Sequence, residues 1–395
     1  MSNIRNFHVV PGKAEAEADF SEKIKKHKMT SILRNIVCFL VIAIIAVLLI
    51  IQYKNQVFTN AIITSQADYK KVDNTYFTKN DGNIITYSKD GISCIDSKGK
   101  TRWNMTYEMQ KPIVRTAKGI VAVGDSNGHI IYMIDGNGAI SQVDTNLPLR
   151  DFSVSENGVV AAILENSGNL WVNVYNKSGE LLVEAKATMS MTGYPMTVSI
   201  SGEVMGVSYF SVDGSQMRSS VTFYNFGGVG ENVTDHIVSS YDYVNAVVPT
   251  LHFLNEESAF AVADNRLMFF SGSKKPTGVA DILLDEEIQG IYYGDNYVGL
   301  VFYDKTGTSK YRLDVYADNG KMVMSHLFDM DFKDILIQNE QIMIYNESQC
   351  SLLSMKDREK YTGTFENPVF FVTATDSPRK FVLITENSLE TMELK

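Results

Sequence analysis

The stretch KPIVRTAKGIVAVGDSNGHIIYMIDGNGAISQVDT, residues 111–145, decides the fold. It contains four short runs rich in β-branched residues, KPIVRTA, GIVAVGDS, HIIYMID and AISQVDT, and turns such as SNG and DGNG separate the later runs. Asn-Gly and Asp-Gly pairs supply the positive φ angles that tight hairpins need. The stretch therefore predicts four antiparallel strands. Residues 149–187 repeat the pattern with LRDFSVSE, GVVAAILENS, NLWVNVYN and ELLVEAKA.

The third strand of this unit recurs along the chain. Its copies start 38, 40, 50, 47, 45, 38 and 39 residues apart, which is the period of a four-stranded propeller blade. Single blades cannot bury both faces, so neighbouring blades stack radially until a ring closes. The eight copies are GISCIDSKGK at 91, HIIYMIDGNG at 129, NLWVNVYNKSG at 169, SSVTFYNFGG at 219, RLMFFSGSKK at 266, YRLDVYADNG at 311, QCSLLSMKDR at 349 and SLETMELK at 388.

The last unit has only three candidate strands, VFFVTATD, KFVLITEN and SLETMELK, the last of which reaches Lys395. We expect VFTNAIIT, residues 57–64, to supply the fourth strand, because pairing the two ends locks the ring and removes an exposed edge. The prediction is an all-β propeller of eight four-stranded blades. Seven blades is the alternative, if the irregular stretch 194–241 is misread.

Two other β architectures compete with the propeller. A pair of β-sandwich domains predicts a linker or a change of period near the middle, and the spacing runs on without one. A β-solenoid has a shorter repeat, of about 20 to 30 residues. The spacing favours the propeller over both.

An apolar run precedes the repeats. All sixteen residues from 36 to 51 are apolar, and residues 35–53 contain no charge. A helix of that length spans roughly 28 Å, close to the ~30 Å hydrocarbon core of a bilayer. A buried core helix is the alternative, but such helices are rarely apolar on every side for so long. We predict one transmembrane helix over residues 35–53.

The flanking charges predict the orientation of this helix. Five basic residues lie before it, whereas residues 54–67 carry a single charge, so the positive-inside rule puts residues 1–34 in the cytoplasm and the propeller, residues 54–395, outside the cell membrane. A cleaved signal peptide fits the sequence less well, because the apolar run is followed by Gln52, Tyr53 and Lys54 rather than by the small residues of a cleavage site. An uncleaved signal anchor fits better. The five basic residues are Lys23, Lys25, Lys26, Lys28 and Arg34.

The formal net charge of −10 is unevenly distributed. Residues 1–35 carry +3 and residues 36–395 carry −13. A strongly acidic outer part argues against binding nucleic acid through a broad surface field. The basic cluster before the helix is compatible with anionic lipid, but we interpret it as a topology determinant.

Residues capable of chemistry are sparse. The six His residues show no HxxxH or HExxH spacing, and no GxSxG or Walker motif occurs. The turns DSNG at Asp125, DGNG at Asp135 and ADNG at Ala317 resemble parts of calcium loops but lack their acidic continuation, so we interpret them as hairpins. We expect no catalytic, cofactor-binding or metal-binding set. The His residues are His8, His27, His129, His236, His252 and His326.

The three cysteines are interpreted as unreactive. Cys38 lies in the predicted span, and Cys94 and Cys350 lie in the first and seventh units, which are not neighbours in an eight-blade ring. A disulfide needs Cα atoms within about 7 Å, so we expect buried free thiols. The lack of disulfides is typical of a bacterial envelope protein rather than of a secreted eukaryotic domain.

The repeated unit, as in YMIDGNGAI and DVYADNGKM, resembles the blade of quinoprotein-like propellers and of the outer-membrane-assembly lipoprotein propeller. The whole arrangement, a basic tail, one signal anchor and a propeller, is similar to a family of bacterial membrane proteins of unknown function. Quinoprotein blades carry a recurrent Trp docking motif, whereas this chain has only Trp103 and Trp171. We therefore expect neither pyrroloquinoline quinone nor dehydrogenase activity.

These features predict a membrane-anchored, extracytoplasmic, non-catalytic binding or scaffold protein of the bacterial cell envelope. Its partner would be another protein or a cell-wall component, docked on a face of the ring or at the central opening. The alternative is an enzyme or ligand sensor that uses the central channel. Because propellers host many functions, the fold alone does not choose between them.

Overall fold

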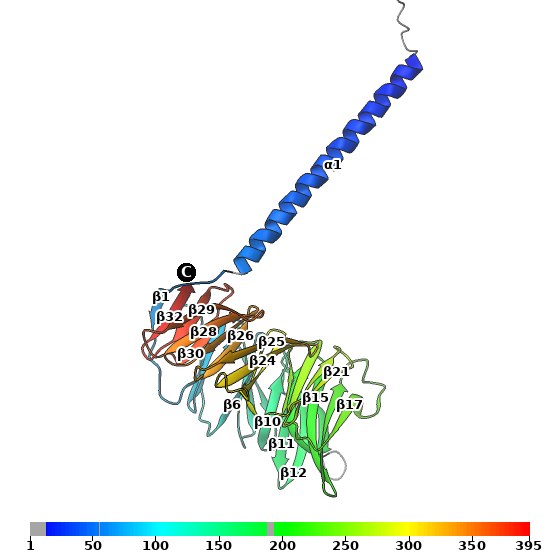
Figure 1. The fold of residues 1–395 in the computed structure, drawn as a ribbon. Helices are drawn as coiled ribbons and strands as arrows, with labels where there is room; N and C mark the ends of the chain where they lie inside the picture. The colour runs from blue at the N-terminus through cyan, green and yellow to red at the C-terminus, as the bar shows by residue number, and fades with distance from the viewer. Residues whose placement is uncertain (1–12, 55, 188–192) are drawn as a thin grey trace, which may run out of the picture. The chain divides into compact units, whose positions relative to one another are not determined.

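The structure is a computed structural model that describes residues 13–54, 56–187 and 193–395. The chain divides into two compact units, Met1–Val57 and Phe58–Lys395. The first contains a helix and the second contains all of the described strands (Figure 1). Each unit is described by itself.

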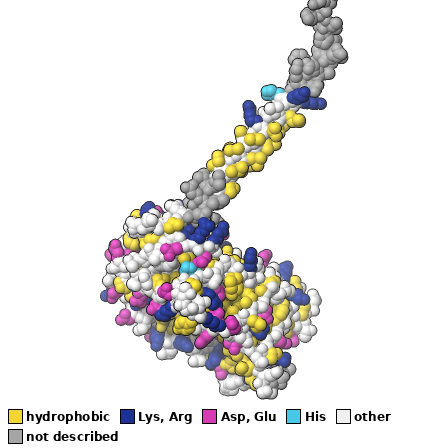
Figure 2. Space-filling view, viewed as in Figure 1, with side chains coloured by type: hydrophobic (Ala, Val, Ile, Leu, Met, Phe, Trp, Pro, Cys, Tyr) yellow, Lys and Arg dark blue, Asp and Glu magenta, His cyan; other side chains and the backbone are white. Residues whose placement is uncertain are grey.

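Helix α1 (Lys13–Lys54) covers the apolar run. Its segment Lys25–Val47 is 23 residues long with a mean hydropathy of 2.3, and none of it is buried. On the face shown in Figure 2, apolar side chains cover the segment beyond its basic residues. Among the described residues it is the one helix long and apolar enough to cross a membrane.

The second unit consists of eight four-stranded antiparallel sheets, each a blade. Strands of the first four blades are as follows: blade 1, β2 (Tyr76–Asn80), β3 (Asn83–Tyr87), β4 (Gly91–Ile95) and β5 (Thr101–Thr106); blade 2, β6 (Pro112–Ala117), β7 (Ile120–Asp125), β8 (Ile130–Asp135) and β9 (Ile140–Asp144); blade 3, β10 (Leu149–Val154), β11 (Val160–Asn166), β12 (Asn169–Tyr175) and β13 (Leu181–Ala187); blade 4, β14 (Tyr194–Ser201), β15 (Val204–Asp213), β16 (Gln216–Asn225) and β17 (Ile237–Val244).

The other four blades follow in chain order, and the last one also takes the first strand of the chain. Their strands are as follows: blade 5, β18 (Thr250–Phe253), β19 (Ser258–Ala263), β20 (Arg266–Ser271) and β21 (Thr277–Leu283); blade 6, β22 (Ile288–Gly294), β23 (Tyr297–Tyr303), β24 (Tyr311–Ala317) and β25 (Met322–Phe328); blade 7, β26 (Asp334–Gln338), β27 (Gln341–Tyr345), β28 (Gln349–Ser354) and β29 (Arg358–Thr364); blade 8, β30 (Phe371–Ala374), β31 (Lys380–Ile384), β32 (Ser388–Leu394) and β1 (Ala61–Asp68).

The predicted eight-blade propeller is confirmed. Each of the eight recurring segments forms the third strand of its own sheet. The irregular stretch is a genuine blade: β15 and β16 are ten residues long, and a long loop containing η1 (Thr234–His236) precedes β17. Longer strands and this loop explain the wider spacing there, so the seven-blade alternative is wrong.

The N-terminal strand closes the ring, as the missing fourth strand predicted. β1 pairs antiparallel with β32 from Ala61 opposite Leu394 to Asp68 opposite Ser388. The strand starts four residues later than the predicted 57–64, because the preceding residues pack against the ring first. Phe58 is 5% exposed and its N–H donates to the Lys360 carbonyl at 2.7 Å. Closure by distant parts of the chain removes the exposed edge of β32.

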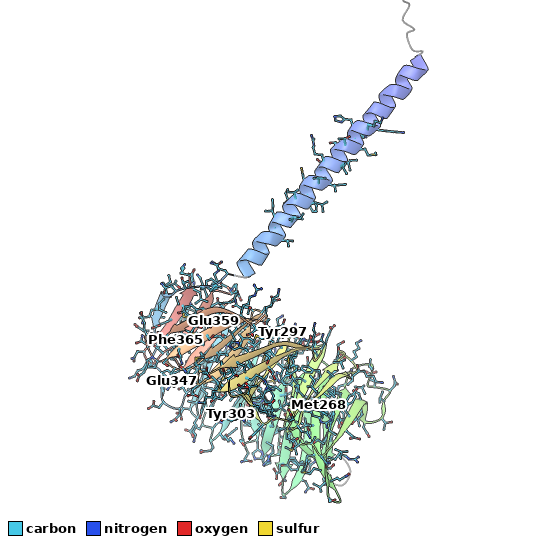
Figure 3. The ribbon with its side chains drawn as sticks, in the orientation of Figure 1. Met268, Tyr297, Tyr303, Glu347, Glu359 and Phe365 are labelled. Atoms are coloured by element: carbon cyan, nitrogen blue, oxygen red, sulfur yellow. The ribbon has the colours of Figure 1, made fainter. Side chains whose placement is uncertain are left out.

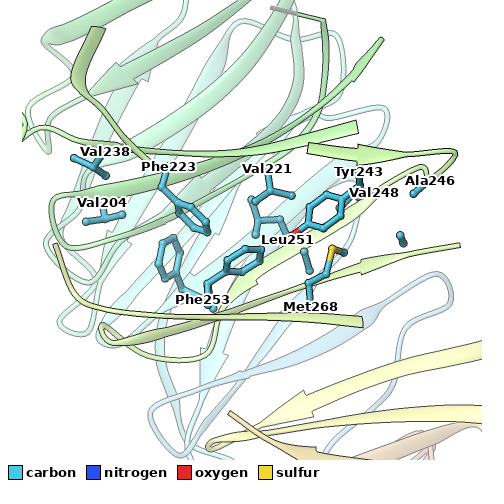
Figure 4. Packing of buried hydrophobic residues seen from close by; sticks show 14 residues of the cluster. Val204, Val221, Phe223, Val238, Tyr243, Ala246, Val248, Leu251, Phe253 and Met268 are labelled. Carbon is cyan, nitrogen blue, oxygen red and sulfur yellow. The ribbon is translucent and has the colours of Figure 1, made fainter. Parts of the chain in front are cut away.

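The core lies between neighbouring blades. In the cluster between blades 4 and 5, the ring of Phe223 makes edge contacts with Phe253 and Phe270 at centroid distances of 6.1 and 5.0 Å (Figure 4). Figure 3 labels two residues that differ in burial. Met268 lies inside blade 5 and is 1% exposed, whereas Tyr303 lies at the end of β23 and is 55% exposed. Alternate residues of each strand therefore face adjacent blades, and the stacking fixes the first strand of every blade around the central axis.

Candidate functional site

The histidines are distributed over several blades. His129 is exposed, His236 lies against Phe226, and the Nδ1 of His326 lies 2.6 Å from an Asp357 carboxylate oxygen. His252 faces the centre of the ring. His8 lies outside the described residues, and His27 is exposed on α1. Within residues 13–54, 56–187 and 193–395, no group of three His, Cys, Asp or Glu side chains is placed to hold a metal ion.

The acidic turns use their carboxylates to hold hairpins together. One carboxylate oxygen of Asp135 accepts the N–H groups of Asn137 and Ala139 at 2.9 and 3.0 Å, and these bonds lower its pKa. Asp125 accepts N–H groups from the start of blade 2 in the same way. Gly138 has a φ of +85°, and a Cβ there would lie 2.7 Å from Trp103. The turn chemistry explains these residues, in line with the hairpin interpretation.

The two ring cysteines are buried free thiols, and Cys38 is an exposed free thiol on α1. Burial raises the pKa of Cys350 to about 12 and also raises that of Cys94. A thiol with a raised pKa is a poor nucleophile. Both side chains serve the core between blades.

The centre of the ring contains a cavity of about 860 Å³. It is lined by first strands, or the turns that follow them, from blades 1 to 6, so its wall combines six separate parts of the sequence. Eight serine and threonine side chains contribute to the lining: Thr78, Thr116, Ser153, Ser155, Thr197, Ser199, Ser201 and Thr250. A cavity of this size and polarity can hold a small polar ligand.

A fixed ion pair forms one wall. The Arg115 guanidinium in β6 donates to an Asp151 carboxylate oxygen at 2.7 Å, and its Nε donates to the Phe152 carbonyl at 3.1 Å. Its remaining nitrogen donates to the Val114 carbonyl at 3.2 Å. Three acceptors therefore hold the guanidinium in place, and Asp151 offsets its charge.

Tyr293 and His252 form another part of the wall. Their ring centroids lie 4.4 Å apart, and Phe260 packs against Tyr293 at 5.4 Å. Tyr293 is 47% exposed because its ring lines the open cavity. Burial, helped by the positive charge of Arg115, lowers the pKa of His252 to about 4. The imidazole is therefore neutral at neutral pH.

Serine hydroxyls join the first strands of successive blades. Ser153 accepts the N–H of Ile200 at 3.2 Å, and Ser199 accepts the N–H of Phe253 at 3.1 Å. These bonds cross from blade 3 to blade 4 and from blade 4 to blade 5. The cavity wall is thus tied together by side chains that also line it.

Contacts among blades 1, 7 and 8 form the remaining part of the ring's centre. Lys79 donates to the Gln338 side chain at 2.9 Å, and Phe77 stacks on Phe371 at 5.7 Å. Burial lowers the pKa of Lys79 and raises that of Asp334. These contacts join blade 1 to blades 7 and 8, so the first and last blades meet through side chains as well as through β1.

Turns between first and second strands surround one mouth of the cavity, and they are acidic on balance: Glu156 and Glu256 line the mouth together with Lys118. Glu256 follows β18, and its pKa is raised by hydrogen bonding to Glu156 and by the charge of that neighbour. Both carboxylates are solvent-exposed. With Arg115 paired, His252 neutral and Lys118 outnumbered by Glu156 and Glu256, the cavity suits an uncharged ligand bearing hydroxyl groups better than an anion.

Sequence reasoning predicted a central opening but none of the residues around it. The missed side chains are Arg115, Asp151, His252 and Tyr293, from four blades. The available signal was weak: polar residues alternate with buried ones in first strands such as LRDFSV and TLHF. Alternation identifies a face of a strand, but it does not say which faces meet across a ring.

Because the pKa of His252 is lowered on folding, its effect on stability can be given a sign. The unfolded state, with a pKa near 6.5, takes up the proton more readily, so this group lowers the free energy of unfolding as pH falls from about 6.5 to about 4. We expect His252→Phe to remove at most about 3 kcal/mol of that acid-induced loss while keeping the contact with Tyr293. Denaturant unfolding of the parent protein and of His252→Phe, each at neutral pH and at about pH 4.5, tests this. Equal losses of unfolding free energy in the two proteins would contradict it.

Comparison with known proteins identifies the fold and a family. A family model described as "Family of unknown function (DUF5711)" matches residues 54–394. Apo AztD from Citrobacter koseri is 10% identical, covering 78% of this chain and 93% of that chain with a TM-score of 0.54. A second AztD structure from the same organism is 11% identical, covering 74% and 87% with a TM-score of 0.51.

BamB from Moraxella catarrhalis is 12% identical, covering 85% of this chain and 98% of that chain with a TM-score of 0.48. At these identities the likeness concerns the fold alone. No curated protein matches the chain.

Proposed function

This chain belongs to the DUF5711 family of unknown function, and we propose that it is a membrane-anchored, extracytoplasmic binding scaffold of the bacterial cell envelope. In this proposal α1 is an uncleaved signal anchor, residues 1–34 are cytoplasmic, residues 35–53 cross the membrane and residues 54–395 form the external ring. The ring binds a protein or a cell-wall component and catalyses no reaction.

The observation that carries the proposal is the covalent connection between α1 and the strand that closes the ring. α1 ends at Lys54, Phe58 is buried in blade 8, and β1 follows from Ala61. Three residues between Lys54 and Phe58 span at most about 14 Å. A ring joined to a membrane helix in this way is confined to the membrane surface.

Confinement favours binding over catalysis as the use of the ring. A tethered domain meets other membrane-bound partners at a high effective concentration, so a modest binding site is sufficient. The acidic turns around the cavity mouth and the polar cavity itself are the surfaces available for such contacts. The direction of insertion follows from the basic residues in the N-terminal part of α1, before its apolar run, by the positive-inside rule.

A second candidate function is that of a ligand sensor. The specific observation in its favour is the 860 Å³ cavity, where an aromatic ring and several hydroxyls converge from six blades. Tyr293 could stack on the apolar face of a small polar ligand while the hydroxyls bond to its polar groups. Binding there would bridge blades 2 to 6 and stiffen the ring.

Detaching the ring tests the proposed function. We expect residues 54–395, secreted with a cleavable signal in a strain lacking the native protein, to fail to restore its phenotype, because the effective concentration at the membrane is lost. In a matched control the same residues are joined to an unrelated signal anchor, and this re-anchored ring should restore the phenotype. Protein amount and protease resistance are measured for both forms. Full rescue by the freely diffusing ring would contradict the role of the anchor.

A further inference from the structure

One side-chain position recurs on the first strands of blades 2 to 6. Arg115 of β6 donates to a carbonyl of β10, Ser153 of β10 accepts an N–H of β14, and Ser199 of β14 accepts an N–H of β18. His252 of β18 continues the series, with its ring centroid 4.4 Å from that of Tyr293 in β22. The first four side chains each reach the first strand of the next blade, and all five line the cavity. We call these five residues the inner row.

The inner row divides into a polar part and an aromatic part. Its first three members are an arginine and two serines, and Asp151 beside Arg115 adds a carboxylate. Its last two members are the rings of His252 and Tyr293. Burial is the main cause of the low pKa of His252 and of the raised pKa of Tyr293, and the positive charge of Arg115 acts on both groups. Because Arg115 lies on blade 2 and the rings lie on blades 5 and 6, this influence acts across the centre of the ring. The two parts therefore face the same space.

The polar part keeps donors and acceptors available to a ligand. Ser153 and Ser199 each accept an N–H through their oxygen, and neither hydroxyl donates to a group within residues 13–54, 56–187 and 193–395. One oxygen of Asp151 accepts from Arg115 and from the N–H of Phe152, and its other oxygen accepts nothing from the described residues. A guanidinium has five N–H donors, and Arg115 uses three of them on protein acceptors.

The aromatic part presents a fixed apolar plane. The Tyr293 ring packs against His252 at 4.4 Å and against Phe260 at 5.4 Å, yet it is 47% exposed to the cavity. Its neighbours hold the ring in place, so its exposed surface is available without reorganisation. Burial raises the pKa of Tyr293, so its hydroxyl is protonated at neutral pH and adds a polar group at the edge of the plane.

The charged groups of the lining favour a neutral ligand. Arg115 and Asp151 form an ion pair at 2.7 Å, so the charges beside the inner row cancel. Lys118, Glu156 and Glu256 lie at the mouth, where the acids are in excess. The imidazole of the row is neutral at neutral pH, because burial lowers its pKa. An anionic ligand would meet no unpaired cation within the row, and a cationic ligand would meet no unpaired acid there.

We propose that the cavity binds a neutral pyranose sugar, with one face of the sugar stacked on Tyr293 and its hydroxyls bonded by Arg115, Asp151 and the serines of the inner row. A pyranose has C–H bonds on its faces and hydroxyls around its edge, so it requires an apolar plane together with donors and acceptors beside that plane. The inner row supplies both. This inference deepens the binding role proposed above, and it rests on that role in placing the cavity outside the membrane. A free sugar and the terminal sugar of a cell-wall glycan share this chemistry.

The test measures sugar binding by the full chain in phosphatidylcholine nanodiscs, because detergents with sugar headgroups would compete. The probes are methyl β-glucoside and methyl N-acetyl-β-glucosaminide, titrated by saturation-transfer NMR. Methyl β-glucuronide is the matched charged probe, since it differs from the glucoside by a carboxylate. We expect saturable binding of at least one neutral glycoside, at least about fivefold tighter than the glucuronide, because the glucuronide carboxylate would lose its water without gaining an unpaired cation.

Substitutions in the inner row and outside it identify the site. Tyr293→Leu removes the aromatic plane and should weaken binding about fivefold, whereas Tyr293→Phe keeps the plane and should stay within about twofold of the parent. Asp151→Asn keeps the shape of the side chain but removes its charge, and should weaken binding about tenfold. The matched control is Tyr303→Leu in the same blade, where Tyr303 stacks on Tyr311 away from the cavity lining, and it should bind like the parent.

The melting temperature of each variant without sugar shows whether the ring is folded, and the comparison of Tyr293→Phe with the parent applies even if Tyr293→Leu unfolds. Soluble glycan fragments of the cell wall distinguish the two sources of the sugar. Tighter binding of the fragments than of the methyl glycosides assigns a wall glycan, and equal binding assigns a free sugar. Lack of saturable binding of either neutral glycoside, or equal weakening by Tyr293→Leu and Tyr303→Leu with both folded, would overturn the proposal. The role of the anchor is tested separately, by the rescue experiment with the detached ring.

Discussion

Deletion of residues 388–395 is expected to destroy the closed ring, leaving a chain that aggregates or is degraded. The deletion removes β32, which pairs with both β1 and β31. Leu389, Met392 and Leu394 are each no more than 3% exposed, and losing a buried side chain of this size costs about 2 to 5 kcal/mol. Together these losses approach the whole stability of a typical domain.

The comparison that isolates ring closure uses a milder change at the same strand. Glu393→Gln alters a side chain that pairs with Lys395 outside the core, and should leave the melting temperature within a few degrees. Leu394→Asp places a carboxylate among the residues that pack between blades 7 and 8, and should behave like the deletion. Thermal unfolding and limited proteolysis of detergent-purified full-length proteins provide the readout. A deletion variant that melts like the parent would contradict closure by β1.

The fold was predictable because its signal is local and repeated. Each hairpin turn is encoded by residues within the turn itself, such as Asp135 and Gly138. Eight copies of the strand-and-turn unit at a regular spacing leave few alternatives to a propeller. Closure was predictable from a missing strand. The start of β1 was not, because burial of Phe58 against blade 8 and Arg379 is a tertiary effect that no local pattern encodes.

The candidate site was not predictable for the opposite reason. Arg115 and Asp151 are 36 residues apart in sequence, and Tyr293 comes from a blade four places further along the ring from that of Arg115. Each is a single polar residue in a short strand, without a motif. The curvature of the ring brings them to one cavity, and curvature depends on packing between whole blades.

The proposed arrangement divides the functions of the chain among its parts. α1 holds the ring at the membrane, β1 transmits that attachment into blade 8, and the channel and its acidic mouth remain open for binding. Each of these roles requires the ring to lie on the outer side of the membrane with the helix uncleaved. Sidedness is therefore the claim on which the rest depends.

Site-specific labelling of intact protoplasts or spheroplasts tests that claim most directly. In a Cys38→Ala background, Lys89→Cys places a thiol in an exposed turn of blade 1, and Ser21→Cys places one before the apolar segment, while Cys94 and Cys350 stay buried. A membrane-impermeant maleimide should label Lys89→Cys in intact cells and Ser21→Cys only after permeabilisation. The labelled chain should retain an N-terminal epitope tag. Labelling in the reverse order, or an externally labelled chain that has lost its tag, would contradict an uncleaved anchor with an external ring.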